Sequence, residues 1–231
     1  MKTQVFCMAI LAALFTGTVS AYEITANAGV VSEYVFRGLP QTDGNAAAQG
    51  GFDISEGDFN LGAWASTVKG GDSIDNSGPN PILVSGDNGL ELDFYAAYSN
   101  SFGEIDYSVG ATYYTYTDNF DDDYIELNLS GAWKWLSIDA AVGEYKNFAG
   151  PTLEYSFVSL TGEYQGFYTT VGDFSEDFEG TYYEVGYGNT LNAGGDDLFD
   201  YSISFINSNS DLANDSYLLF GITKNFELFS K

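Results

Sequence analysis

The residues of this chain that could do chemistry are carboxylates, and many of them recur at every second position of short alternating segments. The chain has 33 Asp and Glu against 7 Lys and Arg, and its formal net charge is −26. Alternation of apolar and polar residues is typical of β-strands with two unlike faces. We predict that the polar face lines a pore. Its charged residues are ten acids and two bases: Glu33, Asp53, Glu91, Asp93, Asp106, Glu126, Asp139, Glu154, Glu184 and Asp200, with Arg37 and Lys134. If this face encloses a lumen, such an excess of carboxylates concentrates cations there.

A second group of acids is concentrated in one predicted loop and could coordinate calcium. Residues 118–123 read DNFDDD, and hard divalent cations bind roughly six to eight oxygen ligands. The spacing does not match the EF-hand loop, which requires a central Gly and a terminal Glu. A solvated acidic loop is the reading that this composition favours. The weak calcium candidates are Asp118, Asp121, Asp122 and Asp123.

Catalysis finds little support in the residue types. The sequence contains no histidine, which removes Ser-His-Asp catalysis and histidine metal ligands. Carboxylate pairs are abundant, but spacing singles out none of them. The one cysteine, Cys7, lies in an N-terminal apolar run, so no disulfide framework is predicted. We therefore predict a protein that is not an enzyme and that uses no cofactor.

The elements that must position the carboxylates are about twelve β-strands whose connections alternate in length. A transmembrane barrel sorts its connections in this way, because its periplasmic turns are short and its outer loops are long. The joins expected to be long are 40–47, 70–89, 117–123 and 207–215, those expected to be short are 55–58, 102–104 and 165–166, and 192–197 is ambiguous. We predict an all-β fold: an antiparallel transmembrane β-barrel of about 12 strands with both termini in the periplasm.

The apolar face of the strands is predicted to meet lipid, with Leu92, Leu127 and Ile203 near the bilayer midplane. In the strand near residues 153–157, Leu153, Tyr155 and Phe157 set the apolar face and Glu154 the polar one. Many segments are about ten residues long, which a tilted strand needs to cross the hydrocarbon. Aromatic residues near strand ends are expected to form the two interfacial girdles. We expect Tyr34, Phe36, Tyr113, Tyr116 and Tyr182 at the outer rim, and Tyr98, Trp133, Trp135 and Phe226 at the inner rim.

The N-terminal residues 1–21 have the pattern of a secretory signal peptide. Lys2 precedes the apolar run 5–15, and Val19-Ser20-Ala21 places small residues before the expected cleavage site. The predicted organisation is a signal peptide over 1–21 and one barrel domain over 22–231. No later segment approaches the ~20 consecutive apolar residues of a membrane-spanning helix. The strong negative charge opposes binding to nucleic acid.

The first part of the predicted barrel resembles a known family. It reads ANAGVVSEYVFRGLPQTDG over 26–44, AQGGFD over 48–53, GAWAS over 62–66 and ELDFY over 91–95. Together these stretches resemble the TorF family of porin-like proteins, a proteobacterial outer-membrane family of unknown function. Beyond residue 100 the resemblance is carried by the strand rhythm. It implies an outer-membrane β-barrel and a channel, and it brings no catalytic or substrate residue with it.

The C-terminal strand departs from the usual pattern of outer-membrane barrels, which end on an aromatic residue. Phe226 is followed by ELFSK, and Lys224 takes a position where an apolar residue is expected. Either an internal assembly signal or a shifted last strand that ends on Phe229 is expected.

These observations predict a narrow, cation-favouring passive porin in the bacterial outer membrane. Its expected partners are outer-membrane lipid, the barrel-assembly machinery and small solutes or cations. Two alternatives stay open. One is a non-conducting barrel that anchors acidic surface loops for adhesion or envelope structure, and the other is a secreted soluble β protein with a ligand cavity.

Overall fold

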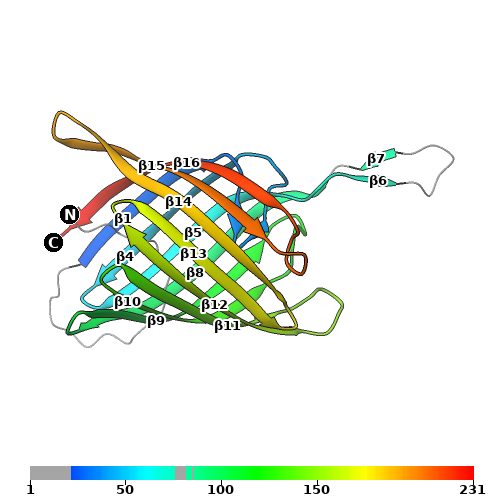
Figure 1. Cartoon of the computed structure of the whole chain (residues 1–231), viewed down its shortest axis with the longest axis horizontal. Coiled ribbons are helices and arrows are strands. Elements are labelled where there is room, and N and C mark those ends of the chain that lie inside the picture. Colours follow the sequence, from blue (N-terminus) through cyan, green and yellow to red (C-terminus); the bar gives the residue numbers. More distant parts are fainter. Residues whose placement is uncertain (1–21, 76–81, 85) are drawn as a thin grey trace.

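The strands of the computed structural model, which describes residues 22–75, 82–84 and 86–231, close into a twelve-stranded antiparallel barrel (Figure 1). Neighbours in sequence are neighbours in the ring, and β1 closes it by pairing with both β4 and β16. This confirms the predicted fold class. The described residues include no helix that could cross a membrane. The predicted signal peptide lies outside the described residues. The barrel strands are β1 (Tyr22–Val31), β4 (Ala47–Glu56), β5 (Phe59–Lys69), β8 (Asn88–Phe102), β9 (Ile105–Tyr116), β10 (Tyr124–Trp133), β11 (Leu136–Tyr145), β12 (Leu153–Tyr164), β13 (Phe167–Glu176), β14 (Gly180–Ala193), β15 (Asp196–Ser208) and β16 (Ser216–Ser230).

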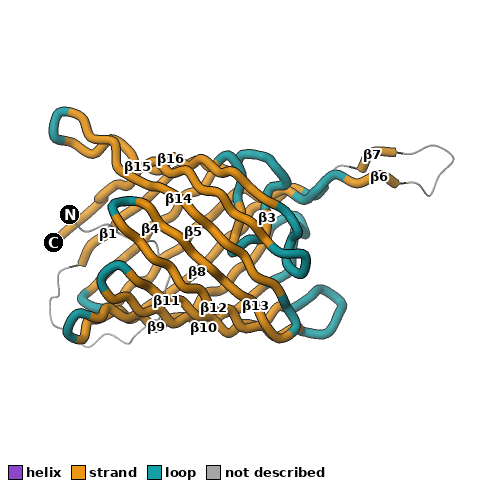
Figure 2. The backbone as a smooth tube through the Cα atoms, viewed as in Figure 1, coloured by secondary structure: helices purple, strands orange, loops and turns teal. Residues whose placement is uncertain are grey.

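The two ends of the barrel differ in the length of their connections (Figure 2). At the end where β1 starts and β16 finishes, the strands are joined by the two-residue turns 57–58, 103–104, 134–135, 165–166 and 194–195. The opposite end carries the connections 32–46, 70–87, 117–123, 146–152, 177–179 and 209–215. We call these the short-turn end and the long-loop end. The predicted sorting of connections is thus confirmed, and the ambiguous join 192–197 is a tight turn at Gly194-Gly195.

Two of the long connections contain small hairpins of their own. The connection 32–46 holds β2 (Val35–Phe36) and β3 (Leu39–Pro40), and 70–87 holds β6 (Ser73–Asp75) and β7 (Ile82–Val84). The β6–β7 hairpin projects away from the barrel at the long-loop end (Figure 1). The β2–β3 hairpin has a different position, described below.

The outward face of the barrel is apolar, as the alternation predicts. Leu127 on β10 is 62% exposed and Val142 on β11 is 56% exposed, and Ile203 on β15 is exposed as well. Apolar side chains surround the barrel in this way on every strand, far beyond the patches that soluble proteins leave uncovered. Such a surface matches a lipid environment.

Strand β12 reverses the predicted faces in its first half. Tyr155 and Phe157 were expected to meet lipid, but they are 4% and 5% exposed and point into the lumen. Glu154, expected in the lumen, is exposed near the start of β12. The prediction was wrong because the two rings were taken as membrane-facing, whereas they pack against other aromatic residues inside the barrel.

Several expected outer-rim aromatics are also internal. Tyr34 and Tyr182 are buried, Phe36 packs beside Tyr34 inside the barrel, and Tyr116 points to the lumen side of β9. These rings take part in internal packing, which sequence position near a strand end does not reveal. In contrast, the side chains of Tyr113, Trp133, Trp135 and Phe226 are exposed near the ends of the barrel.

Luminal tyrosines lie flat over glycines of the neighbouring strand. Tyr95 of β8 is directly opposite Gly62 of β5, and a Cβ atom at Gly62 would come within 2.5 Å of the ring. The same arrangement joins the cross-strand pairs Tyr155–Gly143, Tyr182–Gly172 and Tyr168–Gly186. Each ring occupies the space that a side chain on the glycine would need. At these four places, a tyrosine ring can lie against the barrel wall only because the wall residue opposite it is glycine.

The last strand contains a β-bulge close to its C-terminal aromatic residue, Phe229. Its register against β1 shifts so that Thr25 pairs with Glu227 and Ile24 pairs with Phe229. The extra residue is Leu228, and the shift returns Phe229 to the face of Ile24. The Phe229 ring stacks on Tyr22, with 4.9 Å between centroids. The strand itself continues to Ser230, and which aromatic residue the assembly machinery recognises stays a prediction.

Candidate functional site: a partly filled acidic lumen

The connection 32–46 folds into the barrel, and we call it the inward hairpin. The turn between its two strands is Arg37-Gly38, whose φ angles of 47° and 81° suit a two-residue hairpin turn. A Cβ atom at Gly38 would lie 2.7 Å from Tyr182 Cβ, so glycine is required there for space as well as for conformation. Ser208 donates its hydroxyl to the Gly38 carbonyl at 2.6 Å, which ties the tip to the end of β15.

Arg37 at the tip forms a buried ion pair with Glu126 of β10. Its two terminal nitrogens contact the two carboxylate oxygens at 2.6 and 3.1 Å, and Glu126 is 1% exposed. Glu126 also accepts hydrogen bonds from the Tyr155 hydroxyl at 2.8 Å, the Tyr114 hydroxyl at 3.1 Å and the Asn128 amide at 2.8 Å. Because all donors converge on one carboxylate, the charge is fully compensated.

An aromatic core surrounds this ion pair and fills the lumen near the long-loop end. The Arg37 guanidinium lies 4.2 Å from the centroid of the Phe157 ring, a cation–π contact. The buried members of the core are Ala141, Tyr155, Phe157, Phe174, Tyr182, Ile206 and Tyr217, and Val35 of the inward hairpin packs against them. The inward hairpin and these side chains therefore occupy the lumen in this half.

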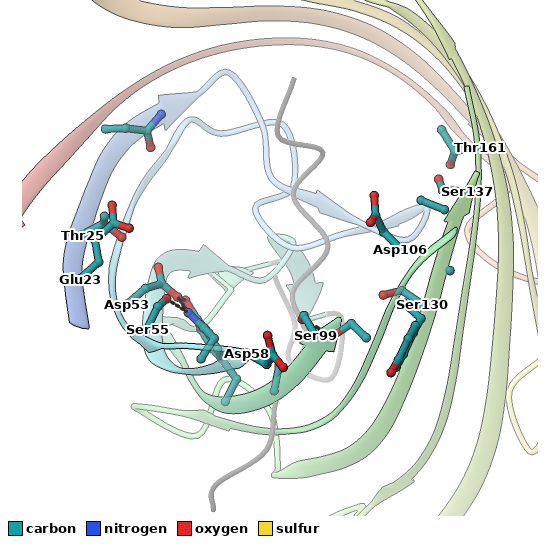
Figure 3. Close-up of a pocket in the computed structure, with 18 of the residues that line it drawn as sticks. Glu23, Thr25, Asp53, Ser55, Asp58, Ser99, Asp106, Ser130, Ser137 and Thr161 are labelled. Carbon is teal, nitrogen blue, oxygen red and sulfur yellow. Dashed lines mark hydrogen bonds between the residues drawn. The ribbon is translucent and has the colours of Figure 1, made fainter. Parts of the chain in front are cut away.

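The other half of the lumen contains a cavity of about 1140 Å³ near the short-turn end (Figure 3). Asp53 and Asp58 lie on one wall and Asp106 on the other, and serine and threonine side chains lie between them. Asp53 accepts hydrogen bonds from the Tyr95 hydroxyl at 2.9 Å and the Asn60 amide at 3.3 Å. The charged residues that line this cavity are Glu23, Asp53, Asp58, Asp106, Glu163 and Glu227, with Lys134. The excess of carboxylates makes the cavity a favourable environment for cations.

The predicted pore residues fall into different parts of the barrel. Asp53 and Asp106 line the cavity, whereas Glu91, Asp93 and Glu126 are buried in the filled half. The remaining acids on the luminal face are Asp139 of β11, Glu184 of β14 and Asp200 of β15. Glu184 accepts the Tyr168 hydroxyl at 2.8 Å, and Asp200 accepts the Thr190 hydroxyl at 2.6 Å.

Four of the predicted positions differ from the sequence expectation. Arg37 and Glu33 were predicted on the polar face of a barrel strand, but β1 ends at Val31 and both residues belong to the inward hairpin. Glu33 accepts the Gly44 backbone N–H at 2.8 Å. Lys134 lies in the turn 134–135 at the mouth of the cavity, where it pairs with Glu104 at 3.1 Å. Glu154 is exposed, for the reason given above for β12.

Sequence reasoning missed the acids Glu23, Asp58, Glu163 and Glu227 and the luminal tyrosines. Glu163 was hidden by the reversed faces of β12, although the exposed Val158 and Leu160 in the same strand indicate the correct alternation. Asp58 lies in a tight turn, outside any alternating segment. Tyrosines that donate to luminal carboxylates cannot be told from membrane-facing ones by residue type.

The calcium candidates make hydrogen bonds within the loops. Asp121 accepts the hydroxyls of Tyr124 and Tyr145 at 2.8 and 2.7 Å, Asp122 accepts the Phe148 backbone N–H, and Asp118 accepts the Thr117 hydroxyl. Among the described residues, no three His, Cys, Asp or Glu side chains are grouped as a metal site. In the structure these three carboxylates accept hydrogen bonds from residues in and beside the long loops.

Asp123, the fourth candidate, is held by Lys146 of the neighbouring loop. The Lys146 ammonium and the Tyr113 hydroxyl both donate to its carboxylate and lower the pKa of Asp123 to about 2. The pair is solvated, so its contribution to stability is small.

Comparison with known proteins gives one family match over most of the chain. A family model described as "Bacterial protein of unknown function (Gcw_chp)" matches residues 16–204. The TorF name is not confirmed by this match. A search of curated proteins found none that matches.

Several solved structures resemble the chain at low sequence identity. They include an anion-selective porin from Comamonas acidovorans, with 10% identity, 90% of this chain and 99% of that chain covered, and a TM-score of 0.38. OmpF of Salmonella typhi in complex with daunomycin has 12% identity, covers 90% and 98% of the two chains, and has a TM-score of 0.38. OccAB2 of Acinetobacter baumannii has 8% identity, 91% and 98% coverage, and a TM-score of 0.36. At TM-scores this low, the likeness gives no information about solutes.

Proposed function

Because the chain belongs to the Gcw_chp family of bacterial proteins, whose function is unknown, we propose a function from the geometry of the barrel. The protein is a narrow, cation-favouring passive porin of the bacterial outer membrane. It is inserted into outer-membrane lipid by the barrel-assembly machinery, and it passes small solutes or cations. The long-loop end faces outward and the short-turn end, with both chain termini, faces the periplasm.

The observation that carries this proposal is the acidic cavity inside a barrel with an apolar exterior. Twelve strands lie between the roughly eight whose interior side chains can fill and the sixteen or more of wide porins, so the passage is narrow. Fixed charges of one sign between low-dielectric walls raise the local concentration of counter-ions. Carboxylates on opposite walls of the cavity therefore favour cations. Since the inward hairpin fills the other half, conduction requires that the hairpin move.

The second candidate function is a non-conducting barrel that anchors loops at the cell surface. It is favoured by the same inward hairpin, whose buried ion pair and aromatic packing close the lumen. A soluble ligand-binding protein is the least favoured, because so many outward side chains are apolar and exposed. Conductance of the folded protein separates the first two functions.

Ion selectivity tests the porin proposal directly. In a planar bilayer with a salt gradient, we expect a reversal potential whose sign indicates that cations permeate better than anions. This preference should weaken at high salt, because the fixed charges are screened. The double variant Asp53→Asn/Asp106→Asn is expected to lower the cation-to-anion permeability ratio about twofold or more, since it removes fixed charge from both walls. Glu154→Gln, which removes an exposed acid outside the lumen, is the matched control. Anion preference, or no conductance from correctly folded protein, would favour the anchor instead.

Orientation in the membrane is tested with single cysteines on intact cells. A membrane-impermeant maleimide is expected to label Ser210→Cys in the connection 209–215 and not Glu104→Cys in the turn 103–104, because only the long-loop end faces outward. Both positions are exposed in the folded barrel, so a difference reports on membrane side. Labelling of the short turn alone would reverse the proposed orientation.

A further inference from the structure

Glu91 and Asp93 form a buried carboxyl pair in the filled half of the lumen. They lie two residues apart on the luminal face of β8 and are 1% and 2% exposed. Burial disfavours the charged form of a carboxyl group, and two buried carboxylates this close in sequence on one face would also repel each other. At least one of the two groups is therefore favoured as the protonated acid.

Nothing else around the pair neutralises its charge. The Tyr34 hydroxyl of the inward hairpin donates to Glu91 Oε1 at 3.1 Å. Within the described residues, no other N–H or hydroxyl group donates to Glu91 Oε2 or Asp93 Oδ1. The nearest base, Arg37, has both terminal nitrogens on Glu126. Two unpaired negative charges buried this closely are strongly unfavourable.

The surrounding groups add negative charge or none. On β5, the residues opposite the pair are Ser66 and Trp64, which do not titrate. The titratable group nearby on β8 itself is Tyr95. Those that face the pair from other elements are Tyr34 of the inward hairpin, Tyr114 and Tyr116 of β9, Glu126 of β10 and Asp121 of the connection 117–123.

We propose that Glu91 and Asp93 form a proton-binding site that keeps the inward hairpin docked, and that loss of a proton from this pair releases the hairpin. When the O–H bond breaks, the proton passes to a base in solution and two adjacent carboxylates remain. They then need water, and Tyr34, which covers Glu91, lies between them and the long-loop side. Movement of the hairpin lets water in. This proposal goes beyond ion conduction and does not depend on it.

The test measures access to the hairpin rather than current. In a Cys7→Ser background, Val35→Cys reports on undocking, because Val35 packs against the aromatic core. Ala46→Cys, exposed in the same connection, corrects for the reactivity of the thiol at each pH. With folded protein in detergent and a chelator present, we expect the Val35-to-Ala46 labelling ratio to rise about tenfold or more between about pH 6 and about pH 9.

Neutral isosteres decide whether the pair is responsible. Glu91→Gln and Asp93→Asn each remove one charge, so we expect the labelling ratio to stay low at both pH values. Asp53→Asn, a luminal acid outside the pair, should keep the wild-type response. Heat-modifiable migration on gels confirms that each variant is folded. The proposal is overturned if the wild-type ratio does not change with pH, if both isosteres still respond, or if added calcium rather than pH controls the ratio.

Discussion

Replacing Arg37 by alanine is expected to open the filled half of the lumen. The substitution leaves Glu126 buried at 1% exposure without its cation, and breaking a buried ion pair from one side costs about 3–5 kcal/mol. This free-energy cost is reduced most easily if the inward hairpin moves out of the lumen, because water then reaches the Glu126 carboxylate. We expect Arg37→Ala to raise single-channel conductance above that of the wild type and to lower the temperature at which the barrel unfolds on gels.

Two further variants make the Arg37 result specific. Arg37→Met/Glu126→Gln removes both charges and keeps apolar volume at the tip, so it should conduct like the wild type. Lys69→Ala removes an exposed pair with Asp72, whose charged atoms are 3.8 Å apart, and such pairs contribute about 1 kcal/mol or less. If Arg37→Ala stays as closed and as stable as Lys69→Ala, the buried ion pair does not hold the hairpin.

The second large effect is expected at the lipid face of β10. Leu127→Arg places a charge on an outward position that is 62% exposed to the surroundings of the barrel. An arginine near the bilayer midplane costs about 2–4 kcal/mol. Ser130→Arg on the same strand points into the acidic cavity, where its charge is favoured. We therefore expect Leu127→Arg to reduce the folded fraction in lipid vesicles severely and Ser130→Arg to leave it near the wild-type value.

Heat-modifiable migration after refolding measures both β10 variants in one experiment. Equal loss of folding in both would mean that the two faces of β10 are assigned wrongly. Normal folding of Leu127→Arg would mean that this face does not meet the hydrocarbon of a membrane.

The barrel was predictable from sequence because its main signals are local. Alternation fixes the faces of most strands, and turn residues such as Gly103 and Gln165-Gly166 mark the short connections. Each of these signals depends on a few adjacent residues, so it can be recognised without knowledge of the fold.

The inward hairpin was not predictable because its contacts are distant in sequence. Arg37 meets Glu126, 89 positions away, and Gly38 accepts from Ser208, 170 positions away. An Arg-Gly turn in a long connection is compatible with a loop in solvent as well as with one inside the barrel. The luminal packing of Tyr155 and Phe157 is also made with residues distant in sequence, since the Arg37 guanidinium lies over the Phe157 ring and Phe174 packs beside both rings.

The tyrosine–glycine pairs of the barrel wall have a consequence for how the strands assemble. Three of the four pairs join strands that follow each other directly along the chain, β11 with β12 and β13 with β14. A slip by one residue would turn the tyrosine toward lipid if its own strand reverses its faces, or would bring a Cβ atom under the ring if the glycine strand does. A wrong alignment is therefore penalised as soon as two successive strands meet, before β1 and β16 close the ring. The tyrosine–glycine pairs thus favour the correct strand register during assembly, although in the finished barrel they only fill the lumen.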